Sequence, residues 1–149
     1  MRIVKEAEER KNEILDVAGR LFGEQGYDAT STNDILKEIG IARGTLYHHF
    51  KSKEEIMDAM IDRMTEQILE KAKSIVKQTE IPVLQRFTMM MLALNISDGS
   101  FGHEILEQVH KPQNALMHQK IQEKLLFEVT PLIATLITEG ISQGICQTD

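Results

Sequence analysis

The sequence has few cysteines, which cross-link small exported proteins, and few prolines, which interrupt helices. Its 149 residues include one cysteine, three prolines and no tryptophan. A single thiol, Cys146, excludes an intramolecular disulfide framework, and we expect it to be an inert thiol near a chain end. Three prolines leave long stretches in which helices can run without interruption. These absences indicate a helical protein of a reducing compartment.

Signals for export or membrane insertion are also scarce. The first ten residues are charged and contain no apolar signal-peptide core. We find no apolar run near the roughly 20 residues that span a bilayer. Hydrophobic residues make up 42% and charged residues 27% of the chain, as in soluble globular proteins. We therefore expect a cytoplasmic protein with a packed core.

Positive charge is in deficit overall, because the net charge is -6. That balance disfavours general phosphate binding, which needs a local excess of lysine and arginine. The segment 30–53 differs from the rest, since its basic residues outnumber its acidic ones. The basic residues are Lys37, Arg43, Lys51 and Lys53, and the acidic residues are Asp34 and Glu38. This basic segment also contains dense turn signals.

Apolar residues recur at intervals of three and four along almost the whole chain, which predicts an all-α fold. Successive helices are expected up to Gly26, over 31–39, over 43–50, from Ser52 to before Pro82, after Pro82, over 101–110 and from about Gln113, with a kink at Pro131. Capping boxes are expected at Ser31 with Asp34 and at Ser52 with Glu55.

The segment 31–50 has the layout of a helix-turn-helix, with a short turn around Gly40 between two helices. Leu46 and Phe50 lie one helical turn apart, so they are expected to face the core. The outward side of the second helix then presents a set of groups suited to DNA, namely Arg43, Gly44, Thr45, Tyr47 and His48.

Each of these groups has a role in DNA recognition. Arg43 can donate two hydrogen bonds to guanine, Thr45 can bond a base or a phosphate, and Gly44 permits close approach of the backbone. Tyr47 and His48 can donate to phosphates. Lys51 and Lys53 flank the start of the next helix, where an anion is favoured.

The stretch TSTNDILKEIGIARGTLYHHFKSKEEI, preceded by ILDVAGRLFGEQGYDAT, resembles the DNA-binding domain of TetR-family transcriptional regulators. The resemblance implies a dimeric, all-α repressor that releases operator DNA when a small molecule enters a pocket in its C-terminal helices. It implies a helix-turn-helix domain over 1–51 and an incomplete effector-binding and dimerisation domain over 52–149. The matching DNA-contact positions are Thr32, Arg43, Thr45, Tyr47, His48 and Lys51.

The chain departs from similar sequences in three respects. Ala42 stands where a capping serine is common, and Asn33 offers an amide in place of a basic group. Similar proteins also carry two more C-terminal helices that pair with a second subunit, so this chain resembles a shortened one. We expect weak operator binding from it. We also expect an uncovered apolar stripe of Leu132, Ile133, Leu136, Ile137 and Ile141.

The second half of the chain offers candidates for an effector site, because methionine side chains adapt to irregular pockets. The expected lining is Met64, Phe87, Met90, Met91, Leu106 and His110, and the alternative is that these residues form ordinary core. A different class of function would use His103, Glu107 and His110 as a metal or catalytic cluster. We expect no metal, no cofactor and no enzyme, because the sequence has no nucleophile-base pair, phosphate loop or paired carboxylates.

Overall fold

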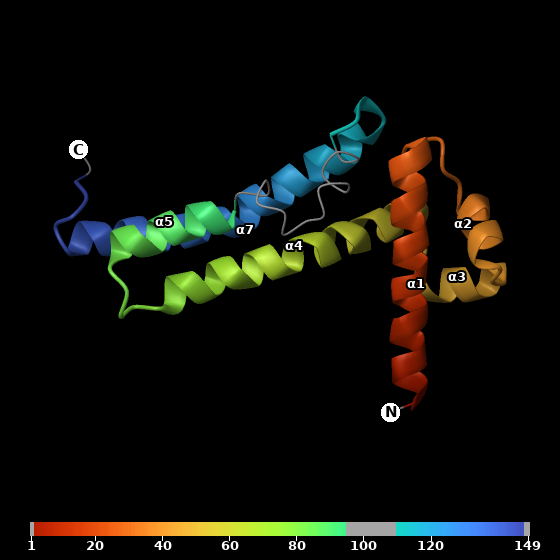
Figure 1. The fold of residues 1–149 in the computed structure, drawn as a ribbon, viewed down its shortest axis with the longest axis horizontal. Helices are drawn as coiled ribbons and strands as arrows, with labels where there is room; N and C mark the ends of the chain where they lie inside the picture. Colours follow the sequence, from red (N-terminus) through yellow and green to blue (C-terminus); the bar gives the residue numbers. More distant parts are fainter. Residues whose placement is uncertain (1, 95–109, 148–149) are drawn as a thin grey trace. The chain divides into compact units, whose positions relative to one another are not determined.

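The computed structural model describes residues 2–94 and 110–147, and all regular elements in these residues are helical (Figure 1). They are α1 (Arg2–Gln25), α2 (Thr32–Ile39), α3 (Arg43–His49), α4 (Lys53–Lys77), α5 (Val83–Ala93), the 3-10 helix η2 (Pro112–Asn114) and α7 (Ala115–Ser142). The all-α class is confirmed, and Pro131 lies within α7. The helix expected over 101–110 lies outside the described residues.

The contacts divide the chain into two compact units. Within the described residues, the first unit comprises 2–63 with 110–119, and the second comprises 64–94 with 120–147. Helices α4 and α7 therefore contribute to both units. The segment that precedes α7 groups with the N-terminal helices, although it is far from them in sequence. A domain boundary between residues 51 and 52 stays a prediction.

The core of the first unit is built by the apolar stripe that the sequence predicts on α1. Ile14, Ala18 and Phe22 are fully buried. Leu46 on α3 is buried, and so is Phe50 directly after that helix, as their spacing indicates. The apolar side of α3 is thus fixed against the unit, which leaves its other side exposed.

Local signals define the short helix α2. The Ser31 hydroxyl accepts a hydrogen bond from the Asp34 N–H at 3.1 Å, and the Asp34 carboxylate accepts one from the Ser31 N–H at 2.7 Å. The Asp34 carboxylate also accepts from the Ser31 hydroxyl at 2.7 Å, and the side-chain and backbone bonds that it accepts from Ser31 lower its pKa. Gly40 closes the helix with a φ of 75°, in the left-handed region that favours glycine. The predicted capping box and stop are confirmed.

The second capping box forms only in half. The Ser52 hydroxyl accepts from the Glu55 N–H at 3.1 Å, as expected. The Glu55 carboxylate, however, accepts from the N–H of Lys51 at 2.5 Å instead of that of Ser52. The acidic side chain therefore still covers a free donor at the start of α4, one residue earlier than the motif predicts.

The second unit packs helices α4, α5 and α7 around a small apolar core. Its fully enclosed members are Ala72, Ile75, Val83, Met90, Ala93 and Leu136. An arginine lies among them: Arg86 of α5 has no exposed surface. Its Nε donates to the Ile81 carbonyl at 2.9 Å, its Nη1 donates to the Val76 carbonyl at 2.8 Å, and its Nη2 pairs with the Glu139 carboxylate. One guanidinium thus ties the end of α4 and the following turn to α7.

The long helix α7 is more apolar than the sequence reading allowed. The segment Pro112–Ser142 is long and apolar enough to cross a membrane by length and composition. The expectation that no stretch has this property is wrong by that measure. Core helices of soluble proteins pass the same test, so the finding assigns no membrane role.

Exposure along α7 also differs from the expected stripe. Leu136 is buried in the core, and Leu132 and Ile133 pack against it, whereas Ile137 and Ile141 are each 40% exposed. The most exposed apolar side chains lie earlier in the helix. They line a shallow depression made by Glu123, Leu126, Phe127, Glu128, Thr130 and Pro131.

We predict that Arg86→Met destabilises the protein by about 3–5 kcal/mol, because it leaves the Glu139 carboxylate and two carbonyls without their partner. The control is Arg63→Ala, which removes an exposed pair with Asp16 and is expected to cost at most about 1 kcal/mol. Urea unfolding measures both losses. Equal losses would show that burial of the Arg86 pair carries no special weight.

Candidate nucleic-acid interface

The α2–turn–α3 segment presents one side of α3 to solvent. Arg43 and His48 are exposed, Tyr47 is 37% exposed, and Thr45 is half-buried. Leu46 is 1% exposed and holds the opposite side of α3 against the core. Ala42 provides no side-chain cap, as expected from its lack of a polar group. The predicted α3 residues therefore share one accessible surface around a buried anchor.

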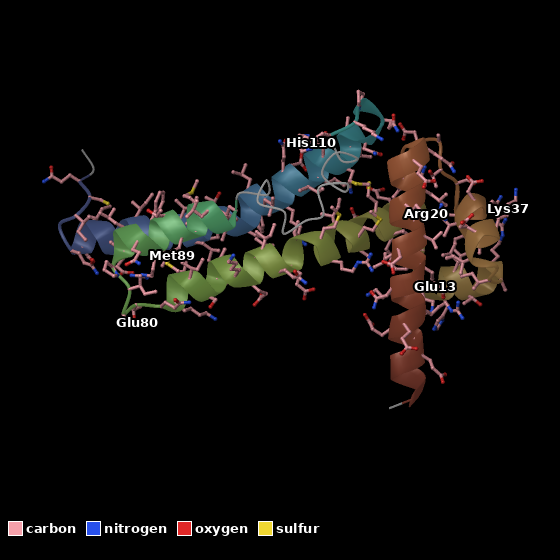
Figure 2. All side chains as sticks on the ribbon, viewed as in Figure 1. Glu13, Arg20, Lys37, Glu80, Met89 and His110 are labelled. Atoms are coloured by element: carbon pink, nitrogen blue, oxygen red, sulfur yellow. The ribbon has the colours of Figure 1, made fainter. Side chains whose placement is uncertain are left out.

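Two further predicted residues extend this surface to the neighbouring helices. Thr32 is half-buried at the first position of α2, and Lys51 is exposed between α3 and α4. Figure 2 shows the side chain of Lys37 on the side of α2 that faces away from α1. Basic groups are thus available on both flanks of α3.

Lys53 is engaged by its own chain. Its Nζ donates to the Tyr27 carbonyl at 2.8 Å and lies 4.2 Å from the centroid of the Tyr27 ring. The side chain is half-buried. One of its three N–H donors is therefore used within the protein, and a phosphate contact by Lys53 beside Lys51 stays a prediction.

Arg43 is held in place by a residue of the preceding helix. Its Nη2 donates to the Asn33 Oδ1 at 2.7 Å, and both side chains are exposed. The bond joins the second residue of α2 to the first residue of α3. Asn33 differs from the residue at this position in similar TetR-family sequences, but the sequence does not predict its contact with Arg43.

The loop after α1 is fastened to the segment that precedes α7. The Tyr27 N–H donates to the Asn114 Oδ1 at 3.2 Å, and Asn114 is 1% exposed. The approach is close at Gly26 also, where an added Cβ would lie 2.9 Å from the Cβ of Gln113. Residues 113–114 therefore form part of the unit that contains the candidate interface.

The pKa of the histidine that ends α3 is lowered. Burial lowers the pKa of His49, and the nearby His48, Arg10 and Lys11 lower it further, while Glu8 opposes them. The rings of His48 and His49 lie 5.3 Å apart between centroids. His49 is therefore harder to protonate than an ordinary histidine.

The predicted effector residues are only partly brought together. Phe87 is half-buried and packs on the core cluster that contains the fully buried Met90. Met91 is 47% exposed, so it lies on another side of α5 from Met90. Met64 is half-buried at the start of the second unit. Leu106 lies outside the described residues.

The alternative cluster is described at one of its three positions. His103 and Glu107 lie outside the described residues. His110, labelled in Figure 2, is exposed in the first unit. Its ring lies 4.9 Å from that of His118 between centroids. Over 2–94 and 110–147, no group of three His, Cys, Asp or Glu side chains is placed to hold a metal ion.

The described residues include four buried polar ones, Thr30, Thr65, Arg86 and Asn114, and none of these was predicted from the sequence. Arg86 had a signal, because it falls in phase with Val83, Met90 and Ala93 on the apolar side of α5. A charged residue at such a position has to be paired or hydrogen-bonded. Asn114 had none, because its partner Tyr27 is 87 residues away in sequence.

The geometry of α2, the turn at Gly40 and α3 is that of a helix-turn-helix. Residues 14–60 match the family model described as bacterial regulatory proteins of the tetR family. The repressor KstR2 of Mycobacterium tuberculosis is 35% identical over 92 residues, which cover 62% of this chain and 46% of that protein. The fatty acid metabolism regulator protein of Bacillus subtilis is 29% identical over 150 residues, covering 95% of this chain and 73% of that protein.

A solved structure supports the same fold across both units. FadR of Bacillus subtilis, determined in complex with stearoyl-CoA, has a TM-score of 0.67 and 24% identity, and the match covers 91% of this chain and 73% of that one. The segment 14–60 is therefore similar to the corresponding segment of the TetR family of bacterial regulators. Its match to KstR2 spans about half the length of that relative.

We predict that Gly44→Ala stabilises the protein yet weakens DNA binding. Gly44 lies within α3 without a positive φ, and an added Cβ meets nothing within 4 Å, so alanine should gain about 0.5–1 kcal/mol. In a complex with DNA, the same methyl group would lie where the α3 backbone has to come close to the DNA. Thermal melting and a gel shift measure the two effects.

Gly40→Ala is the matched control, because its Cβ also meets open space but its φ of 75° disfavours alanine. It should lose about 1–2 kcal/mol of stability. Unchanged DNA binding by Gly44→Ala would show that the backbone there does not approach DNA.

Proposed function

We propose that this chain is a DNA-binding transcriptional repressor that releases its operator when a small molecule binds. The observation that carries the proposal is the exposed side of α3, where Arg43, Gly44, Tyr47 and His48 surround the buried anchor Leu46 inside the family-matched segment. An exposed helix with a bidentate donor and several phosphate donors suits the major groove.

We propose that residues at the start of α3 recognise the DNA bases and that residues on its flanks position the protein on the DNA backbone. Arg43 and Thr45 read base edges, since recognition helices use their N-terminal residues for this purpose. Thr32, Tyr47, His48 and Lys51 contact phosphates, which fix the register of the protein without carrying sequence information. A homodimer would present two such helices to half-sites about 34–36 Å apart.

We propose that the protein acts in the cytoplasm and has no catalytic role. TetR-family members are transcriptional regulators. The relatives that match this chain favour a regulator over the metal-binding alternative built on His103, Glu107 and His110.

We expect Lys51→Ala and Arg43→Ala to weaken DNA binding in different ways. Loss of Lys51 removes a phosphate contact, so it should weaken binding to all duplexes and lower the salt slope by about one unit. Loss of Arg43 should relax one operator position at a cost of about 1–3 kcal/mol. Gel shifts at several salt concentrations, with a duplex selected from a random library, measure both.

The control is Lys71→Ala, which removes the same charge from an exposed position of the second unit and should leave binding unchanged. Equal, sequence-independent losses for Lys51→Ala and Arg43→Ala would contradict the division between base and phosphate contacts. Failure to select any duplex would contradict the proposed function itself.

We infer that the effector is lipophilic and binds the helices after Ser52; of the expected lining, the structure describes Met64, Phe87, Met90 and Met91 in the second unit. Phe87 supports this proposal, because it is half-buried on the core cluster that contains Met90, whose side chain can adapt its shape to a ligand. One similar protein is a fatty acid metabolism regulator, and a similar solved structure holds stearoyl-CoA, so we propose a fatty acyl compound as the first candidate.

Stearoyl-CoA, stearic acid and free coenzyme A form a first panel. A compound that binds only the folded protein at one hundred times its Kd should stabilise it by about 2.7 kcal/mol, which raises the melting temperature. The same compound should weaken operator binding, because coupling between two sites is reciprocal. If no lipophilic compound shifts the melt, the region after Ser52 is only a structural and dimerising core.

A further inference from the structure

The hydrogen bond between Arg43 and Asn33 indicates that these two side chains act together at the candidate interface. We propose that Asn33 is a positioning residue for Arg43, so that operator specificity is set by a pair of side chains from α2 and α3. The proposal rests on the proposed function, because it concerns how that site reads a base.

The hydrogen bond leaves the base-reading edge of Arg43 available. One N–H of Nη2 points to the Asn33 Oδ1 at 2.7 Å. A guanidinium has five N–H donors in a rigid fork, so the Nε proton, the second Nη2 proton and both Nη1 protons remain. Those donors can bond O6 and N7 of guanine together, which is the common bidentate contact of arginine with DNA. The Asn33 contact thus orients the fork without occupying it.

The amide is better suited to this task than a carboxylate. Asn33 accepts the hydrogen bond as a neutral group, so the pair of Asn33 and Arg43 keeps a net positive charge beside the phosphates. The next residue, Asp34, has a carboxylate that accepts from the Ser31 N–H at 2.7 Å and the Ser31 hydroxyl at 2.7 Å. The acid is therefore engaged in the cap of α2.

Prior orientation should strengthen discrimination at one base pair. A free arginine loses rotamer freedom when it docks on a base, and a group already held in place loses less. Because both side chains are exposed, the bond can form in the free protein at little cost to folding. We expect removal of Asn33 to lower the preference at the base read by Arg43 by about two- to tenfold.

The test starts from duplexes that the wild-type chain selects out of a random library. Affinities are then measured for every single-base variant of the selected site, with wild type, Asn33→Ala, Arg43→Ala and the double variant. Asn33→Ala should lose preference at the same position as Arg43→Ala, and the double variant should match Arg43→Ala alone. Binding to an unrelated duplex and the melting temperature should not change for Asn33→Ala.

Two further variants separate orientation from other effects. Asn33→Asp keeps an acceptor of the same shape, so it should retain the base preference while its negative charge weakens binding to all duplexes. Lys37→Ala removes an exposed basic group of α2, so it should weaken binding to all duplexes alike and leave the preference at that position unchanged.

Additive losses in the double variant would overturn the pairing of Asn33 with Arg43. A loss of preference at a different position in Asn33→Ala would also overturn it, because Asn33 would then read its own base. If wild type selects no duplex, the proposed function fails, and this inference fails with it. If Arg43→Ala relaxes one position and Asn33→Ala relaxes none, only the inference fails.

Discussion

The first unit depends on one residue, Tyr27, whose N–H, carbonyl and ring each contact a different part of the unit. Its N–H donates to buried Asn114, its carbonyl accepts from Lys53 of α4, and its ring packs edge-on against Phe22 with centroids 5.2 Å apart. The loop between α1 and α2 is therefore tied both to the long helix and to the segment before α7. In the proposed repressor, a displacement of either partner acts on the loop that leads into the helix-turn-helix.

The second unit is held together in a different way, through one buried charged side chain. Arg86 is enclosed among apolar residues and joins the end of α4, the turn after it and Glu139 of α7. Such a pair is expensive to desolvate, and it stabilises only when each donor finds an acceptor. The packing of α5 against its neighbours is consequently less tolerant of change at Arg86 than at the half-exposed apolar positions around it.

Sequence reading succeeded where the determinant is local. The cap at Ser31, the stop at Gly40 and the buried pair Leu46 and Phe50 all follow from spacings of three or four residues. It failed where the determinant is a distant partner. Nothing near Lys53 in sequence indicates that its ammonium group binds Tyr27, 26 residues earlier. The effector lining mixes the buried Met90 with the exposed Met91, because composition alone does not fix how α5 is rotated.

The position of Lys53 also changes how the charge of this protein should be counted. Its ammonium group is directed to a carbonyl and a ring of its own chain. In the proposed repressor, counterions leave the DNA in proportion to the cations that reach its phosphates, so a lysine engaged by its own chain contributes less than an exposed one. A phosphate contact is the same on every duplex, so its loss lowers the affinity for all sequences alike and leaves the preference for one operator unchanged.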